Sequence, residues 1–392
     1  MTDFALIQQA SQRLDRWIER ENFMGWDPYD ALNSPFLKAL TFGNRRIGQG
    51  WVQLLKRSPI NLRPLLRVRK GYNPKGMGLF LASYLRKYQM TGDVAHLERV
   101  KFFAEWLRAN VSPGYHGACW GYNFDWPNRG FFAPAGTPTI VNTAFIGLAF
   151  MDVLTLGDTS PLGPLALSLA KSASEFILRD LHAEAPTPDE LGFSYTPLDR
   201  RVVHNANMLG AWLLAEVGAR MGDNALCEAA LKASRFTVHR QRTDGAWLYG
   251  VTPYDDWIDN FHTGYVLSAL KRISSLAHTS EFDQPLQKGY AFWKTHFFLT
   301  DGTPKYYENA TYPIDTHCAA QAILTFLAFA DVDPEAKGFA VRIARWGIEH
   351  LQSPQGYFYY QLHRPYPIRI PYMRWTQAWM QRALMEVELQ IR

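Results

Sequence analysis

The sequence has few cysteines, no long apolar run and little net charge. Its 392 residues contain three cysteines, Cys119, Cys227 and Cys318, whose number and spacing exclude a disulfide framework and a paired-cysteine metal site. No stretch approaches the roughly 18 consecutive apolar residues of a membrane-spanning helix. Residues 1–20 read as an amphipathic helix and not as a signal peptide. A net charge of +5 over this length argues against a nucleic-acid partner. These absences predict a cytoplasmic protein.

What the sequence does have is a repeated helical pattern. Six apolar segments, rich in small residues, recur at intervals of 69, 63, 55, 55 and 59 residues and begin at Asn73, Asn142, Asn205, Asn260, Asp315 and Arg374. More polar amphipathic segments lie near 4–21, 95–110, 164–182, 223–239, 280–297 and 335–351. An apolar helix is buried on most faces, whereas an amphipathic helix covers it from outside. We therefore expect one all-α domain over 1–392, an (α/α)6 toroid. An α-solenoid is the alternative, but its repeats are usually shorter.

The loops that lead into the apolar segments hold many of the aromatic residues, which make up 14% of the chain. A glycine followed by aromatic residues predicts a turn into a short strand, so we expect short β-hairpins at one mouth of the ring. Trp and Tyr rings stack on the C–H faces of sugars. The aromatic candidates for saccharide binding are Trp120, Tyr122, Trp126, Tyr195, Trp247, Tyr254, Trp257, Tyr372 and Trp375, and some of them are expected only to fill space between loop and ring.

Carboxylates in the same loops could supply acid/base chemistry, because glycosidic cleavage normally uses two of them. Asp125, Asp256 and Glu308 precede the helix starts and are the preferred acid/base candidates. Asp259 and Asp315 are further catalytic candidates. They also stand where an N-cap belongs, as Asn73, Asn142 and Asn205 do in other hairpins.

His262 and His317 occupy similar positions on neighbouring apolar helices, two or three residues after the expected cap. Either could carry a proton or hydrogen-bond a sugar, and a purely structural role is an equal alternative. We expect no metal and no cofactor, since HExxH and paired cysteines are absent; a Ca²⁺ ion held by loop carboxylates is the alternative left open.

Charge is concentrated in one segment. Residues 31–70 carry nine basic residues and no acidic one, so the other residues together have a net charge of −4. We interpret 24–70 as a basic helical insertion that could contact an anionic polymer, an anionic membrane surface or a synthesis complex. Arg369 and Arg374 could add a second basic cluster at the mouth. Because Arg pairs bidentately with carboxylates, these residues favour a uronate-containing substrate.

Several stretches carry a family resemblance: residues 61–66 (NLRPLL), 73–81 (NPKGMGLFL), 257–265 (WIDNFHTGY) and 374–379 (RWTQAW). The chain resembles a bacterial family found in exopolysaccharide gene clusters. It is more distantly similar to six-hairpin glycosidases and to the C-terminal domain of glucuronyl C5-epimerases. The resemblance implies polysaccharide assembly or modification and supplies no catalytic residues.

We therefore predict a glycoside hydrolase that acts on an acidic bacterial exopolysaccharide or its oligosaccharides, with Asp125 and Asp256 as the acid/base pair and Glu308 in reserve. A uronyl C5-epimerase or polysaccharide lyase is the second hypothesis, with Tyr, His or Glu as the base. A non-catalytic sugar-binding subunit of a synthesis complex is the third.

Overall fold

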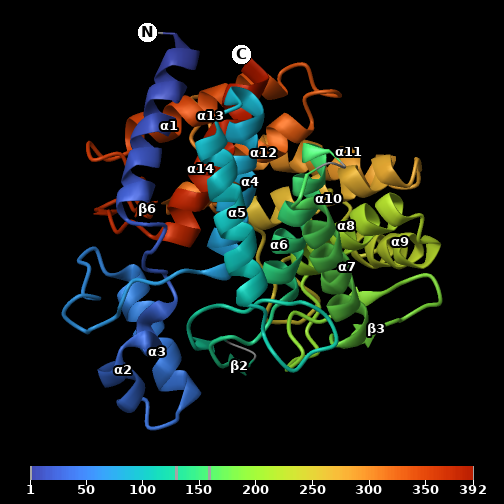
Figure 1. Ribbon diagram of the computed structural model, residues 1–392, viewed down its shortest axis with the longest axis horizontal. Helices are drawn as coiled ribbons and strands as arrows, with labels where there is room; N and C mark the ends of the chain where they lie inside the picture. Colours follow the sequence, from blue (N-terminus) through green and yellow to red (C-terminus); the bar gives the residue numbers. More distant parts are fainter. Residues whose placement is uncertain (1, 129–130, 158–159, 392) are drawn as a thin grey trace.

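A computed structural model describes residues 2–128, 131–157 and 160–391. Within them, six inner helices form a closed ring, because each contacts the next and α14 contacts α4 (Figure 1). The inner helices are α4 (Pro74–Thr91), α6 (Ile140–Val153), α8 (His204–Met221), α10 (Asn260–Leu276), α12 (Thr316–Ala328) and α14 (Ala378–Ile391). The predicted (α/α)6 toroid is confirmed.

The outer layer consists of amphipathic helices at the predicted places. They are α5 (Val94–Ala109), α7 (Gly163–Arg179), α9 (Asn224–Val238), α11 (Asp283–His296), α13 (Ala336–Leu351) and α1 (Asp3–Arg20). Helix α1 packs beside α13 and α14, so the two ends of the chain together complete the ring (Figure 1).

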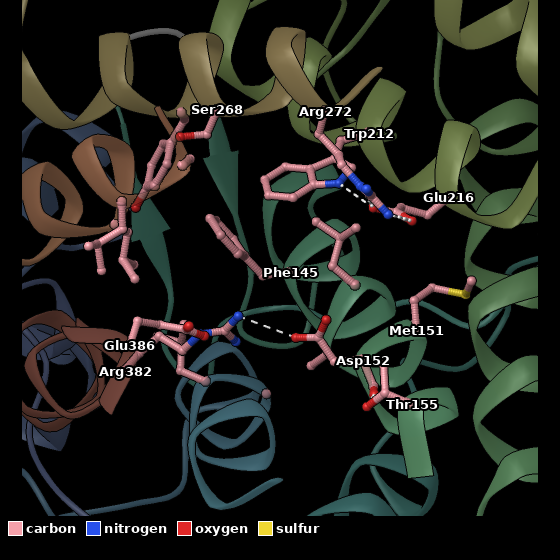
Figure 2. Close-up of a pocket in the computed structure, with 18 of the residues that line it drawn as sticks. Phe145, Met151, Asp152, Thr155, Trp212, Glu216, Ser268, Arg272, Arg382 and Glu386 are labelled. Carbon is pink, nitrogen blue, oxygen red and sulfur yellow. Dashed lines mark hydrogen bonds and ion pairs between the residues drawn. The ribbon is translucent and has the colours of Figure 1, made fainter. Parts of the chain in front are cut away.

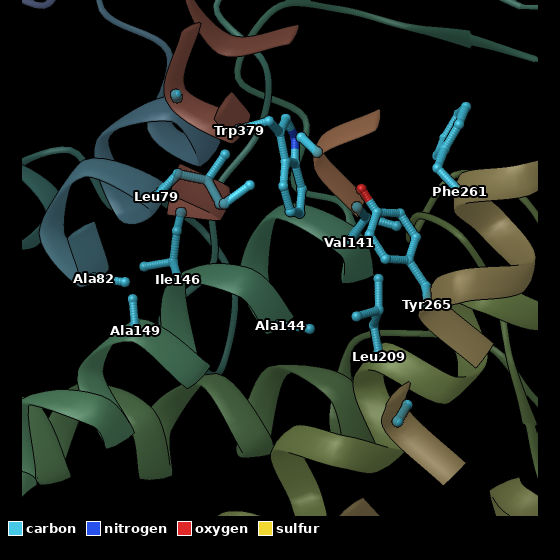
Figure 3. Close-up of a cluster of buried hydrophobic side chains, with 14 of the residues drawn as sticks. Leu79, Ala82, Val141, Ala144, Ile146, Ala149, Leu209, Phe261, Tyr265 and Trp379 are labelled. Carbon is cyan, nitrogen blue, oxygen red and sulfur yellow. The ribbon is translucent and has the colours of Figure 1, made fainter. Parts of the chain in front are cut away.

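Small residues let the inner helices approach closely. A Cβ atom on Gly147 of α6 would lie 2.6 Å from Leu213 of α8, and one on Gly210 of α8 would lie 2.5 Å from Ile140 of α6. Figure 3 shows the buried side chains that fill the space between the inner helices, among them Leu79, Ile146, Leu209 and Trp379. Full burial of such a side chain contributes roughly 1.5–3 kcal/mol, so this packing holds the ring together.

The predicted helix caps are only partly correct. Asn73, Asp259 and Asp315 cap α4, α10 and α12 through their side chains. Asn142 and Asn205 do not: α6 is capped by Thr139, and α8 begins at His204 without a side-chain cap. Both helices start one or two residues earlier than predicted, because the preceding loop pairs with a neighbouring loop before the chain turns. This frees the two asparagine side chains from capping.

Short strands lie in the loops at one end of the ring. β1 (Trp126–Pro127) pairs with β2 (Phe132–Ala133), and β3 (Ala183–Glu184) pairs with β4 (Gly192–Phe193). β5 (Ile314–Asp315), β6 (Gln361–Leu362) and β7 (Pro367–Ile368) form an antiparallel sheet in which Asp315 pairs with Gln361. A π-helical turn, η3 (Met373–Gln377), leads into α14, and a 3₁₀ turn, η2 (Leu154–Leu156), follows α6.

The segment between α1 and α4 projects from the mouth end of the ring (Figure 1). It contains η1 (Asp30–Asn33), α2 (Pro35–Ala39) and α3 (Arg45–Arg57) around a small core formed by Ala31, Leu32, Leu37, Val52 and Leu55. Two buried ion pairs fix its ends: Arg374 bonds both carboxylate oxygens of Asp27 at 2.6 and 2.8 Å, and Arg63 bonds Asp30 at 2.6 Å. No described helix has the length and apolarity that crossing a membrane requires.

Candidate active site

The N-terminal ends of the inner helices and the mouth loops enclose a cavity of about 1230 Å³. Helix α3 forms part of its wall, through Gln49, Gln53 and Lys56 among others. Of the residues predicted from the sequence, ten line the cavity: Tyr122, Trp126, Tyr195, Tyr254, Asp256, Trp257, His262, His317, Arg374 and Trp375.

His262 is held by a carboxylate on its own helix. Its Nδ1 lies 2.7 Å from Oδ2 of Asp259, the cap residue of α10, and Trp257 Nε1 donates to the same oxygen at 3.1 Å. Asp259 is buried, whereas the side chain of His262 is 22% exposed. A carboxylate that accepts from Nδ1–H leaves the lone pair of Nε2 available to take a proton. This is the orientation that a general base requires.

His317 is placed differently. Its Nε2 lies 2.5 Å from the hydroxyl of Tyr265, and its ring stacks on Phe261 and Trp379. Its Nδ1 is buried and finds no partner among the described residues. Burial, helped by the charges of Lys75 and Arg374, holds the pKa of His317 well below its usual value, so the ring is neutral. A neutral His317 orients the Tyr265 hydroxyl, which lines the cavity.

Lys75 is a lining residue that the sequence reading missed. Its ammonium group lies 4.3, 5.2 and 5.6 Å from the ring centroids of Phe145, Trp379 and Tyr265. Lys75 forms no ion pair among the described residues; Asp27, which bonds Arg374, acts on it only from beyond ion-pair distance and raises its pKa. Burial, and then the charge of Arg374, lower the pKa of Lys75 well below 10.5. Its position relative to the helix cap could have identified it, because Lys75 lies two residues after the cap Asn73, as His317 lies two residues after the cap Asp315.

The predicted carboxylates occupy three different environments. Asp256 is exposed and lines the cavity. Asp125 and Glu308 do not line it; Asp125 accepts a hydrogen bond from Ala135 N and pairs with Lys38 at 2.7 Å. Asp315 is fully buried and accepts from Gln361 and Trp375, and burial raises its pKa to about 6. The structure therefore does not bring Asp125 and Asp256 together in the cavity wall.

Two other carboxylates line the cavity, but both are engaged. Asp255 is buried and pairs with Arg201 at 3.0 Å while accepting from Thr252. Asp199 accepts from Thr196 and from the main chain of Arg201. Their bonds shape the loops around the cavity and leave Asp256 as the available carboxylate among the described lining residues.

The aromatic candidates divide into two groups. Trp257 stacks on Tyr249, with ring centroids 4.4 Å apart, and both line the cavity. Trp120 and Trp247, in contrast, are buried in the ring, and their indole N–H groups donate to the main chain of α5 and α9. Tyr372 is fully buried, and Arg369 is exposed over Tyr359; neither lines the cavity.

The cavity wall carries more positive than negative side chains. Its six cations are Lys56, Arg57, Lys75, Arg200, Arg201 and Arg374, and its three described carboxylates are Asp199, Asp255 and Asp256. Asn205 adds a buried Oδ1 atom without a partner in the described part of the chain. In that same part, no cluster of three or more His, Cys, Asp or Glu side chains is arranged to hold a metal ion.

A second cavity, of about 660 Å³, lies at the other end of the ring, among the C-terminal ends of the inner helices. Figure 2 shows that two of its arginines are paired: Arg272 with Glu216 at 2.7 Å, and Arg382 with Asp152 at 3.2 Å. Tyr265 and Trp379 contribute to its wall as well, and Trp379 also contacts Lys75. These rings therefore separate the second cavity from the first.

Comparison with known proteins identifies the fold. No protein-family model matches the chain, and no curated protein matches it. Solved structures do. A sugar epimerase from a ruminal bacterium is 15% identical with a TM-score of 0.63, over 83% of this chain and 90% of that one. Cellobiose 2-epimerase from Bacillus thermoamylovorans is 11% identical with a TM-score of 0.63, over 83% and 90%. An unsaturated glucuronyl hydrolase specific for heparin is 11% identical with a TM-score of 0.60, over 83% and 89%.

Proposed function

We propose that the protein is a carbohydrate-active enzyme that transfers a proton on an anionic saccharide, as a uronyl epimerase does. The observation that carries the proposal is the Asp259–His262 pair, which presents an oriented imidazole to a cavity lined by aromatic rings. Similarity to two epimerases and a glucuronyl hydrolase supports a saccharide as the substrate. A bacterial exopolysaccharide as its source stays a prediction from the sequence.

The excess of cations in the wall supports an anionic substrate. Arg374 and Arg201 already pair with Asp27 and Asp255, but Lys75 has no carboxylate partner in the described structure. Burial disfavours the ammonium form of Lys75 and lowers its pKa, and the one carboxylate that raises this pKa, Asp27, is bonded to Arg374. A uronate carboxylate would stabilise the ammonium form. Trp257 and Tyr249 would stack on a sugar ring, and Asn205 Oδ1 would accept from a hydroxyl.

The proposed chemistry uses the acidity of the C–H bond beside a carboxylate. His262 Nε2 removes that proton, and Asp259 stabilises the imidazolium that forms. Lys75 stabilises the negative charge that develops on the carboxylate. Tyr265, whose ring centroid lies 6.1 Å from that of His262, returns a proton to the carbon. The partly exposed His262 then loses the proton it took to solvent in the cavity, from which the Tyr265 hydroxyl is restored. Burial raises the pKa of Tyr265, so the hydroxyl keeps its proton until it is used.

A glycoside hydrolase is the second candidate, and Asp256 is the observation that favours it. This carboxylate lies exposed in the cavity wall, as an acid or a base for cleavage would. Hydrolysis needs a second carboxyl group about 5–9.5 Å away, however, and the other described lining carboxylates are tied to Arg201 and Thr196. We therefore prefer proton transfer.

The test is incubation of a uronate-containing oligosaccharide with the protein in D₂O, followed by mass spectrometry. We expect deuterium at the carbon beside the carboxylate without chain shortening, loss of that signal in His262→Gln, and its retention in Asp256→Asn. His116→Gln is the matched control, because His116 pairs with Asp180 at the same 2.7 Å outside the cavity. Chain shortening that Asp256→Asn abolishes would establish the hydrolase instead. Binding without exchange or shortening would indicate a sugar-binding subunit.

A further inference from the structure

The segment that projects beside the cavity leaves an unusual number of large apolar side chains in solvent. Phe42 is 83% exposed, Leu65 78% and Ile60 68%. The remaining members of this apolar surface, all about half exposed, are Phe36, Leu40, Ile47 and Leu54. Isolated exposed apolar residues are ordinary, but seven within residues 36–65 form a group that points to a binding surface.

The arrangement on α3 is that of an amphipathic interfacial helix. Ile47 and Leu54 are seven positions apart, so they share one side of the helix. Gly48, Val52 and Leu55 on another side are buried in the segment's own core, whereas Gln49 and Lys56 face the cavity. Ile47 and Leu54 therefore lie on a side of α3 that neither the core of the segment nor the cavity wall covers.

Cations surround this apolar surface. Arg45, Arg46, Arg67 and Arg69 are exposed and do not line the cavity, and residues 31–70 contain no acidic side chain. A protein partner would ordinarily match such a surface with a few carboxylates at defined points. A surface that combines protruding apolar tips with uncompensated cations fits the boundary of an anionic bilayer, where apolar side chains enter the acyl region and arginines contact phosphates.

We infer that residues 36–65, together with the flanking arginines, bind the surface of a membrane rich in anionic lipids. Because Gln49 and Lys56 on the same helix line the saccharide cavity, the bound protein holds its mouth near the lipid surface. The inference does not depend on which reaction occurs in the cavity, since it rests on a different side of α3.

The test is co-sedimentation of the full-length protein with phosphatidylcholine vesicles, with and without phosphatidylglycerol. We expect binding only to the vesicles that contain phosphatidylglycerol, and weaker binding as salt increases. The double variant Arg45→Glu/Arg46→Glu should lower the partition coefficient onto the vesicles on the order of tenfold or more. Each cation near an anionic surface raises this coefficient about fivefold. Phe42→Ser/Leu65→Ser should weaken it by a similar factor.

Matched controls lie elsewhere on the surface. Val332→Ser replaces an apolar residue that is 65% exposed, and Lys337→Glu reverses an exposed charge on α13. Both should leave vesicle binding unchanged. Equal binding to vesicles of phosphatidylcholine alone, equal loss in the control variants, or no vesicle binding would overturn the inference. A concentration-dependent dimer that Phe42→Ser/Leu65→Ser abolishes, without vesicle binding, would also overturn it and assign the surface to a second copy.

Discussion

Replacing Lys75 by Met should weaken binding of an anionic saccharide and leave the fold intact. Lys75 is buried, with only 3% of its surface exposed, and contacts three aromatic rings and no described carboxylate. If the cavity takes a uronate, Lys75 provides its counter-charge. Met has a similar length and no charge, so the substitution removes the charge and little of the packing.

The magnitudes separate binding from stability. A charged hydrogen bond contributes about 1.5–3 kcal/mol, so the dissociation constant for a uronate oligosaccharide should rise roughly 10- to 150-fold. An unpaired buried ammonium group costs several kcal/mol, and three cation–π contacts return about 0.5–2 kcal/mol each. These contributions nearly cancel. The free energy of unfolding should therefore change by no more than about 2 kcal/mol.

The pH dependence has a definite sign. Burial lowers the pKa of Lys75 in the folded protein well below its unfolded value of 10.5. Between those two pKa values the unfolded chain binds more protons, so the stability of the wild type rises with pH toward about 10.5. Lys75→Met lacks this dependence. The free energy of unfolding of the wild type should therefore increase relative to that of Lys75→Met as the pH rises.

Isothermal titration with a uronate oligosaccharide and its neutral counterpart measures the first effect, and urea unfolding at several pH values measures the second. Lys75→Arg keeps the charge and should retain a preference for the anion. Unchanged affinity for the uronate in Lys75→Met, or destabilisation above about 4 kcal/mol, would refute the reasoning and make Lys75 a structural cation.

Arg63→Leu should destabilise the protein by about 3–5 kcal/mol in urea unfolding, because it leaves the buried Asp30 carboxylate without its partner; a loss below 1 kcal/mol would show that the pair is replaceable. Burial raises the pKa of Asp315 to about 6, so the wild type should lose about 3 kcal/mol of stability as pH rises from about 4 to 6, and Asp315→Asn should remove that slope. An unchanged slope in the variant would contradict the assignment. Trp257→Ala should weaken saccharide binding roughly tenfold at constant stability, whereas Trp247→Phe should lower stability and leave affinity unchanged; the reverse pattern would show that the cavity wall is wrongly assigned.

The helical pattern was predictable because burial imposes it directly. The outer helices begin and end within three residues of the predicted positions, since their apolar stripe repeats with the helical period. The prediction that Asn142 and Asn205 are N-caps was wrong, because a polar residue at the start of an apolar run resembles a cap in the sequence. The true starts depend on loop pairing between hairpins, which no local pattern records.

The residues that line the cavity were harder to predict, because the sequence does not show whether a loop side chain points into the cavity or into the core. Tyr122 and Trp120 belong to the same aromatic loop, two residues apart, yet one lines the cavity and the other is buried against α5. Lys75 was overlooked because a lysine at a helix start normally lies in solvent. Only the ring, which turns the first residues of each inner helix toward a common axis, makes that position an interior one.

The contact between α1 and α14 has a consequence for the order of assembly. Residues 3–20 and 378–391 are neighbours in space, although nearly the whole chain separates them. Five helix pairs form from segments close in sequence, but this last pair closes a loop that spans the others, and such contacts are slow to form. A circular permutant that joins the two ends and opens another hairpin should exchange this distant contact for a local one and should reach the closed ring by a different route.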